Sequence, residues 1–117
     1  MPVFAYRRPV DLRKRFEGLS ALVQQALCKD PLSGALYLFT NRRRTTAKVL
    51  QFDGTGMTLY VKRLAQGRFA ALWDSDDATA LSLTRPELEL FLQGSQLVGK
   101  MPLAPAAMSE KDLVIRA

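Results

Sequence analysis

Residues 35–64 read ALYLFT NRRRTT AKVLQF DGTG MTLYVKRL, three largely apolar segments separated by two polar ones. In the last segment Met57, Leu59 and Val61 alternate with polar or exposed types, which is typical of a strand with one buried face. Asp53-Gly54 is a strong short-range signal for a hairpin turn. The stretch therefore predicts an antiparallel meander with strands at residues 35–40, 47–52 and 57–64.

Two helices are predicted on either side of this meander. Apolar residues recur at helical spacing after Asp11, which predicts a helix over residues 15–28 with Asp11 as its N-cap. Thr84-Arg85-Pro86-Glu87 has the pattern of a capping box and predicts a second helix over residues 85–93. Further strands are expected at residues 3–6, 69–73 and 79–83.

These elements predict one α+β domain over residues 1–100, an antiparallel β-meander sheet packed with two α-helices. A chain of 117 residues, 48% of them hydrophobic, can bury the core of one domain. Residues 101–117 contain two prolines and no periodicity, so we expect a C-terminal tail that is flexible or ordered by a partner.

Composition also bounds the cellular setting. No stretch reaches the ~20 apolar residues of a membrane span, and the first residues lack the apolar core of a signal peptide. We therefore expect a cytoplasmic protein that does not enter a membrane. Cys28 is the only cysteine, which excludes an internal disulfide and favours a reduced helical residue.

The formal net charge of +6 is unevenly distributed along the chain. Residues 1–68 hold thirteen cations against four acids, whereas residues 69–117 hold four cations against seven acids. The first part therefore carries +9 and the second −3. Such asymmetry predicts one basic surface, and nucleic acid is the usual partner of a basic surface.

The predicted topology brings the cations together. In an antiparallel meander the loop after the first strand, the start of the second and the end of the third share one end of the sheet. A short connection at residues 29–34 should pack the first helix antiparallel to the first strand, so its N-terminus returns to that end. The candidate DNA-binding residues are then Arg13, Lys14, Arg15, Arg42, Arg43, Arg44, Lys48, Lys62, Arg63 and Arg68.

The triplet Arg42-Arg43-Arg44 is unusual for a turn, because adjacent like charges repel and a turn chosen for stability favours Gly, Asn or Asp. An anionic partner would explain it. The alternative is that a solvated loop tip tolerates arginine at little cost, and that strand ends carry cations simply because they are exposed.

Catalysis is not expected. The chain has no histidine, which excludes histidine-dependent nucleases, serine triads and the common zinc sites. Asp30 precedes a proline and Asp53 opens a turn, so both have ordinary structural roles. Asp74, Asp76 and Asp77 could bind a cation weakly but lack the pattern of a calcium loop. We predict no catalytic residues, no metal site and no cofactor.

A series of short motifs resembles one known family. The motifs are Asp11-Leu12-Arg13-Lys14, Phe16-Glu17-Gly18-Leu19, Asp30-Pro31-Leu32-Ser33-Gly34, Phe39-Thr40-Asn41-Arg42-Arg43, Phe52-Asp53-Gly54-Thr55-Gly56, Lys62-Arg63-Leu64, Gly67-Arg68-Phe69, Leu83-Thr84, and the helix from Glu87 to Gly94. In order and spacing they are similar to the small accessory protein encoded beside the transposase in insertion sequences of the family numbered 66, often labelled TnpB or Orf2-like. The RNA-guided nuclease that shares the TnpB label is a different protein, which this chain does not resemble.

The resemblance implies a role in transposition beside a separate transposase that performs the strand chemistry, and it transfers no catalytic residues. Two positions depart from the family pattern. Arg15 stands where a small residue is expected, and Arg44-Thr45-Thr46 stands where Gly-Asp often follows Asn-Arg-Arg. Both changes add or keep positive charge.

These observations predict a non-catalytic accessory protein of transposition that binds DNA, at element ends or non-specifically, through a basic face. Neutralising about six phosphates would give a log-log salt slope of roughly −5. The alternative is a protein adaptor that docks on the transposase without touching DNA. A homo-oligomer is compatible with either function.

Overall fold

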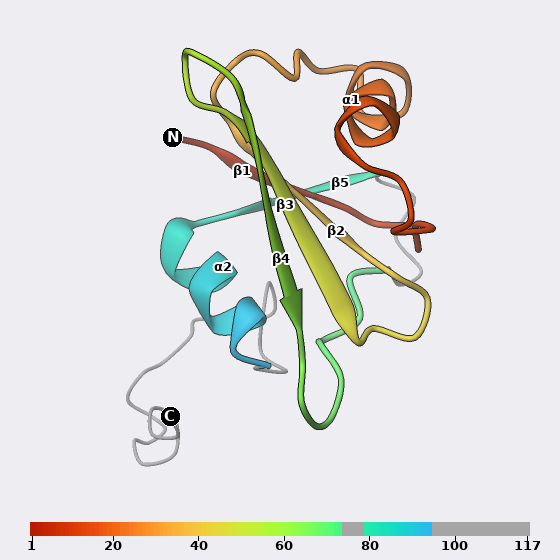
Figure 1. Ribbon diagram of the computed structural model, residues 1–117. Helices are drawn as coiled ribbons and strands as arrows, with labels where there is room; N and C mark the ends of the chain where they lie inside the picture. Colours follow the sequence, from red (N-terminus) through yellow and green to blue (C-terminus); the bar gives the residue numbers. More distant parts are fainter. Residues whose placement is uncertain (74–78, 95–117) are drawn as a thin grey trace.

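The computed structural model describes residues 1–73 and 79–94, which form two helices and one five-stranded sheet (Figure 1). The sheet has the strand order β4-β3-β2-β1-β5. The predicted α+β class is confirmed. In chain order the elements are β1 (Val3–Tyr6), α1 (Phe16–Gln25), β2 (Leu36–Thr40), β3 (Thr46–Phe52), β4 (Met57–Arg63), β5 (Ala80–Leu83) and α2 (Arg85–Leu92).

The meander of β2, β3 and β4 forms as predicted, with Leu38 opposite Val49 and Leu50 opposite Leu59 in antiparallel register. The sheet as a whole is mixed, because β1 pairs with β2 in parallel and with β5 antiparallel. Parallel neighbours need a crossover connection, and α1 with its flanking loops supplies it between β1 and β2. The expectation of a purely antiparallel sheet is therefore corrected at β1.

Each face of the sheet carries one helix (Figure 1). On one face Leu19 and Val23 of α1 pack in a cluster with Tyr37 and Phe39 of β2. On the other face a second cluster unites Leu88 and Phe91 of α2 with Leu38, Val49 and Phe69. The rings of Phe69 and Phe91 stack with their centroids 5.0 Å apart. Full burial of such side chains stabilises the fold by about 1.5–3 kcal/mol each.

Helix α2 begins with the predicted capping box. The Glu87 N–H donates to the Thr84 hydroxyl at 3.2 Å, and the Thr84 N–H donates to the Glu87 carboxylate at 2.8 Å. The helix ends at Leu92, one residue before the predicted end, and Gly94 follows in the left-handed region with φ 93°.

Helix α1 differs from the prediction at both ends. Asp11 is not its N-cap: the Asp11 carboxylate binds Arg13 instead, and Arg15 occupies the cap position without a side-chain cap hydrogen bond. The helix ends at Gln25, and the chain then turns through Cys28, whose φ is 56°. The connection to β2 is therefore longer than expected and does not fix the direction of the helix. Figure 1 looks almost along α1 while β3 runs across the view, so α1 crosses the strands and is not antiparallel to β2.

The strand predicted at residues 69–73 is absent. Phe69 and Leu72 are buried, as their apolar character suggested, but the backbone joins no ladder. Instead the Phe69 N–H donates to the Arg44 carbonyl and the Leu72 carbonyl accepts from Arg7 Nε.

The predicted acidic loop at residues 74–77 and the predicted tail at residues 101–117 lie outside the described residues. Neither of the helices in the described part has the length and apolar character needed to cross a bilayer.

Candidate nucleic-acid interface

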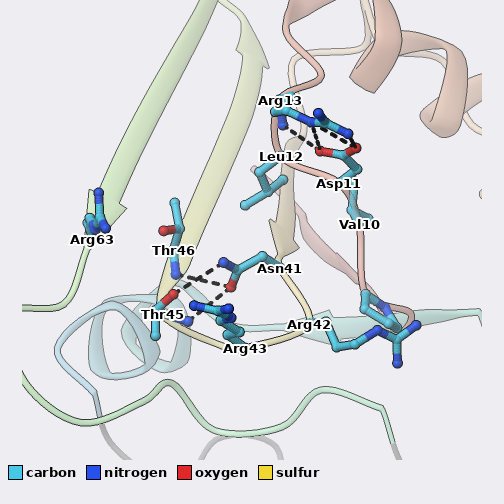
Figure 2. Close-up of a pocket in the computed structure, with 11 residues that line it drawn as sticks. Val10, Asp11, Leu12, Arg13, Asn41, Arg42, Arg43, Thr45, Thr46 and Arg63 are labelled. Carbon is cyan, nitrogen blue, oxygen red and sulfur yellow. Dashed lines mark hydrogen bonds and ion pairs between the residues drawn. The ribbon is translucent and has the colours of Figure 1, made fainter.

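An open groove of about 980 Å³ lies between three segments: the residues before α1, the turn of residues 41–45 between β2 and β3, and the end of β4 (Figure 2). The turn of residues 41–45, which contains Arg42, Arg43 and Arg44, is called the arginine turn below. Among the described residues that line the groove, four are arginines and one is an acid. The lining residues are Pro9, Val10, Asp11, Leu12, Arg13, Asn41, Arg42, Arg43, Thr45, Thr46 and Arg63.

The side chain of Asn41 stabilises the arginine turn by hydrogen bonds within the turn. Its Oδ1 accepts from the N–H groups of Thr45 at 2.9 Å and Thr46 at 3.2 Å, and its Nδ2 donates to the Thr45 hydroxyl at 3.2 Å (Figure 2). The Arg44 N–H closes the turn onto the Asn41 carbonyl at 3.0 Å. Asn41 therefore supplies the side-chain hydrogen bonds to the turn backbone that stabilise a turn and that arginine side chains do not usually provide.

Arg44 occupies the position where the turn requires a positive φ, 62°. This is the residue where the resemblance led us to expect Gly-Asp, and glycine adopts such a φ without steric cost. Arg44 NH1 donates to the Phe69 carbonyl at 3.2 Å, so the side chain is used inside the fold. Arg44 thus ties the turn to residues 69–73 and does not line the groove.

Arg42 and Arg43 project from the turn and are exposed, as is Arg63 at the end of β4. Figure 2 shows Arg43 between the other two, with Arg63 beyond Thr46 on one side and Arg42 on the other. Arg63 is opposite Thr46 in the β3–β4 register, which aims its side chain to the same face of the sheet as Thr46. Three guanidinium groups therefore surround the mouth of the groove without a carboxylate beside them in Figure 2.

The fourth arginine of the groove, Arg13, is paired. Its Nε lies 3.0 and 3.1 Å from the two Asp11 carboxylate oxygens, and its NH2 lies 2.6 Å from Oδ2. The Arg13 N–H also donates to Asp11 Oδ1 at 3.0 Å. These hydrogen bonds from Arg13 hold the pKa of Asp11 well below its usual range and raise the pKa of Arg13. The pair neutralises one of the four cations at this site.

Lys48 positions the segment that carries Arg13. Its Nζ donates to the carbonyls of Leu12 at 2.7 Å and Lys14 at 3.1 Å, so the half-buried amine is satisfied by the backbone. Charge-assisted hydrogen bonds of this kind are stronger than neutral ones. Lys48 therefore fixes the residues before α1 against β3.

Strand alternation separates Lys62 from the other cations of the meander. Lys48 is opposite Val61 and Thr46 is opposite Arg63, so these four share the face that carries α1. Lys62 is opposite Ala47, on the face that carries α2. The predicted gathering at one end of the sheet is observed, but the ten cations do not share one face.

The remaining predicted cations, Lys14, Arg15 and Arg68, do not line the groove. Lys14 is exposed and its side chain lies close to Gly18, where an added Cβ would be 3.1 Å from it. Arg15 is exposed at the start of α1, and Arg68 is exposed in the turn after β4. The structure thus brings Arg13, Arg42, Arg43 and Arg63 into one groove and leaves Lys14, Arg15, Arg44, Lys48, Lys62 and Arg68 outside its lining.

Sequence reasoning missed the structural roles of two residues: Asn41, which stabilises the arginine turn, and Arg7, which lies outside the groove lining. Arg7 is only 7% exposed, and its Nε donates to the Leu72 carbonyl at 3.1 Å. It continues the inward alternation of Val3 and Ala5 in β1, a signal that the sequence does contain. A cation that follows two buried strand positions at spacing two is a candidate for burial.

Acidic and thiol side chains do not gather into a metal site within residues 1–73 and 79–94, where no group of three His, Cys, Asp or Glu residues comes together. The chemistry that the groove offers is that of several arginine guanidinium groups. These groups bind oxyanions such as phosphate in a planar, two-pronged geometry.

Comparison with known proteins identifies relatives. The family described as "IS66 Orf2 like protein" matches residues 1–101. The chain is 37% identical over 84 residues to the "Uncharacterized protein y4hO" of Sinorhizobium fredii, covering 72% of this chain and 71% of that protein. It is 34% identical over 87 residues to the "Uncharacterized protein y4jC" of the same organism, covering 74% of this chain and 73% of that protein. No solved structure matches significantly. The chain therefore belongs to the IS66 Orf2-like family, the accessory proteins of insertion sequences of this type.

Proposed function

We propose that this accessory protein of transposition binds DNA through the arginine-lined groove, contacting the phosphate backbone. Family membership supports the transposition role. The observation that supports DNA as the ligand is the groove itself, about 980 Å³ of open space whose described lining holds four arginines and one acid. That acid, Asp11, is paired with Arg13. The positive charge of the groove therefore comes mainly from the other three arginines, Arg42, Arg43 and Arg63.

The lining favours backbone contact over base reading. The Asn41 amide, which could otherwise read adenine, is used within the turn, and the Thr45 hydroxyl accepts one of its bonds. Among the described residues that line the groove there is no aromatic side chain, so these residues offer bases no stacking surface. Binding through this groove should therefore depend little on DNA sequence.

A salt-titrated binding assay on element-end DNA and on random duplex tests the proposal. With three to four phosphates neutralised in the groove, the log-log salt slope should be roughly −3 to −4. This is shallower than the slope of roughly −5 expected for about six phosphates. Both duplexes should bind with similar affinity. Absence of binding to either duplex, or binding that is insensitive to salt, would show that the groove serves another ligand.

The competing function is that of a protein adaptor whose basic groove accepts an acidic surface of the transposase. A pull-down with purified transposase in nuclease-treated extract separates the two functions. A complex that survives the nuclease and is lost in an Arg42→Ala/Arg43→Ala/Arg63→Ala variant would assign the groove to the transposase. A complex that disappears with the nuclease would favour DNA as the bridge.

A further inference from the structure

Strand β4 forms one edge of the sheet, and nothing in the described part of the chain pairs with its outer side. It is seven residues long and contains neither proline nor glycine. At its centre Tyr60 is 49% exposed and Val61 is 54% exposed. The opposite edge, β5, has only four residues. A long edge strand with exposed apolar side chains is a template for pairing with another strand.

The sequence of β4 is compatible with pairing to a second copy of itself. If two β4 strands run antiparallel with Tyr60 opposite Tyr60, all seven residues find a partner. Each Lys62 then faces Thr58 and each Arg63 faces Met57, so no two like charges are opposed. Leu59 and Val61 face each other on the α1 side of the sheet, and the two Tyr60 rings meet on the α2 side.

We propose that the protein forms a symmetric dimer by antiparallel β4–β4 pairing centred on Tyr60, which joins two five-stranded sheets into one of ten strands. Such an interface is isologous, the commonest type in soluble homo-oligomers. The main-chain hydrogen bonds supply affinity, and the apolar pairs Leu59–Val61 and Tyr60–Tyr60 cover the side chains exposed in a single chain. This inference does not depend on the ligand of the groove.

The symmetry places both grooves on one side of the assembly. The two-fold axis of an antiparallel pair is perpendicular to the sheet, so the α1 faces of both copies point the same way. Since Arg63 of one copy is opposite Met57 of the other, the two Arg63 residues are about 20 Å apart along the strands, using ~3.3 Å per residue. A DNA segment crossing the joined sheet could then contact two arginine clusters.

Charge exchange at Tyr60 tests both the interface and its register. The protein should have the mass of two chains by size exclusion with light scattering. Tyr60→Lys and Tyr60→Glu should each be monomeric, because each places two like charges directly opposite each other. An equimolar mixture of the two variants should recover the mass of a dimer. Leu32→Lys and Leu32→Glu are matched controls, since Leu32 is 58% exposed and lies outside β4, and both should remain dimeric.

Disulfide trapping tests the same register without charge. In a Cys28→Ser background, Tyr60→Cys should cross-link to itself, because directly opposed residues have the Cα separation that a disulfide needs. Thr58→Cys should cross-link only when mixed with Lys62→Cys. A protein that stays monomeric at all concentrations, or Thr58→Cys that cross-links to itself as readily as Tyr60→Cys, would overturn the proposal. In an antiparallel ladder every second β4 amide already donates to β3, so only the remaining β4 amides report on the free edge. Protection of those outward-pointing amides from hydrogen exchange in a monomer would mean that another segment of the same chain covers this edge, and would overturn the proposal too.

Discussion

Arg44 and Phe69, 25 residues apart, are joined by two hydrogen bonds. The Phe69 N–H donates to the Arg44 carbonyl at 2.7 Å, and Arg44 NH1 donates to the Phe69 carbonyl at 3.2 Å. Because Phe69 is fully buried and stacked on Phe91, this pair connects the arginine turn to the core on the α2 face. The turn that presents Arg42 and Arg43 is therefore held by buried structure.

Arg44→Gly should be close to neutral for stability, whereas Arg44→Ala should be destabilising. Glycine loses the side-chain hydrogen bond, worth about 1 kcal/mol, but relieves the left-handed backbone by a similar amount. Alanine loses the hydrogen bond and keeps the backbone strain. The Arg44→Ala protein should therefore unfold at a lower denaturant concentration than Arg44→Gly, with a free energy of unfolding about 1 kcal/mol smaller. Equal midpoints for the two variants would contradict a strained Arg44.

Asn41→Ala should lower the free energy of unfolding by about 2 kcal/mol, because the N–H groups of Thr45 and Thr46 lose their shared acceptor. Asn41→Asp is the matched control. It keeps an acceptor oxygen for both N–H groups and should retain most of the stability. Urea unfolding of the two variants measures the difference, and an Asn41→Ala protein as stable as the wild type would show that the turn does not need this side chain.

Single substitutions of Arg42, Arg43 or Arg63 by alanine should weaken DNA binding on every sequence and reduce the salt slope by about 0.9 each, the contribution of one phosphate contact. All three side chains are exposed, so the unfolding midpoint should not change. Lys62→Ala is the control, since Lys62 lies on the opposite face of the same strand end. If Lys62→Ala reduces the salt slope of DNA binding as much as Arg63→Ala does, DNA does not bind through the groove alone.

Asp11→Asn should tighten DNA binding and steepen the salt slope by up to about 0.9, because Arg13 is released from its carboxylate partner. The matched control is Asp11→Asn combined with Arg13→Ala, which should remove the gain. Since the pKa of Asp11 is well below its usual range, Asp11 should add no pH dependence to binding between pH 5 and 8. Unchanged affinity in Asp11→Asn would mean that Arg13 does not reach the ligand.

Asp53 should make stability depend on pH in the acid range. The N–H groups of Thr55 and Gly56 donate to its Oδ1 at 3.0 and 2.9 Å and hold its pKa below the usual value. A folded-state pKa below the unfolded value of about 3.9 adds stability above that pH, and the gain is lost as the pH falls through the folded pKa.

Thermal unfolding between pH 2 and pH 7 measures this contribution. Asp53→Ala should melt below the wild type at pH 7, and the gap should narrow below about pH 4. Asp53→Asn keeps an acceptor oxygen that does not titrate, so its melting temperature should depend less on pH in that range. If the difference in melting temperature between Asp53→Ala and the wild type stays constant down to pH 2, protonation of Asp53 does not contribute to the pH dependence of stability.

Several features of the fold were predictable because their signals are local. The β3–β4 hairpin follows from alternation and from Asp53-Gly54, and the start of α2 follows from the Thr84 capping box. The end of α1 and the partner of β1 were not predictable, because a left-handed Cys28 and a parallel β1–β2 pairing depend on contacts between distant segments. Residues 69–73 show the same limit, since their apolar pattern indicated burial correctly but could not show that Arg44 and Arg7 bind their backbone.

The sequence by itself determined that the chain is basic in its first half, that it folds around a three-stranded meander, and that cations gather at one end of it. These properties follow from composition and from short-range periodicity. Only the tertiary structure decided which cations share a surface. The register of β4 places Lys62 and Arg63 on opposite faces of the sheet. Lys48 and Arg44 donate hydrogen bonds to backbone carbonyls. Arg13, Arg42, Arg43 and Arg63 remain in the groove, because side-chain direction and hydrogen-bond partners are set by contacts between segments far apart in the chain.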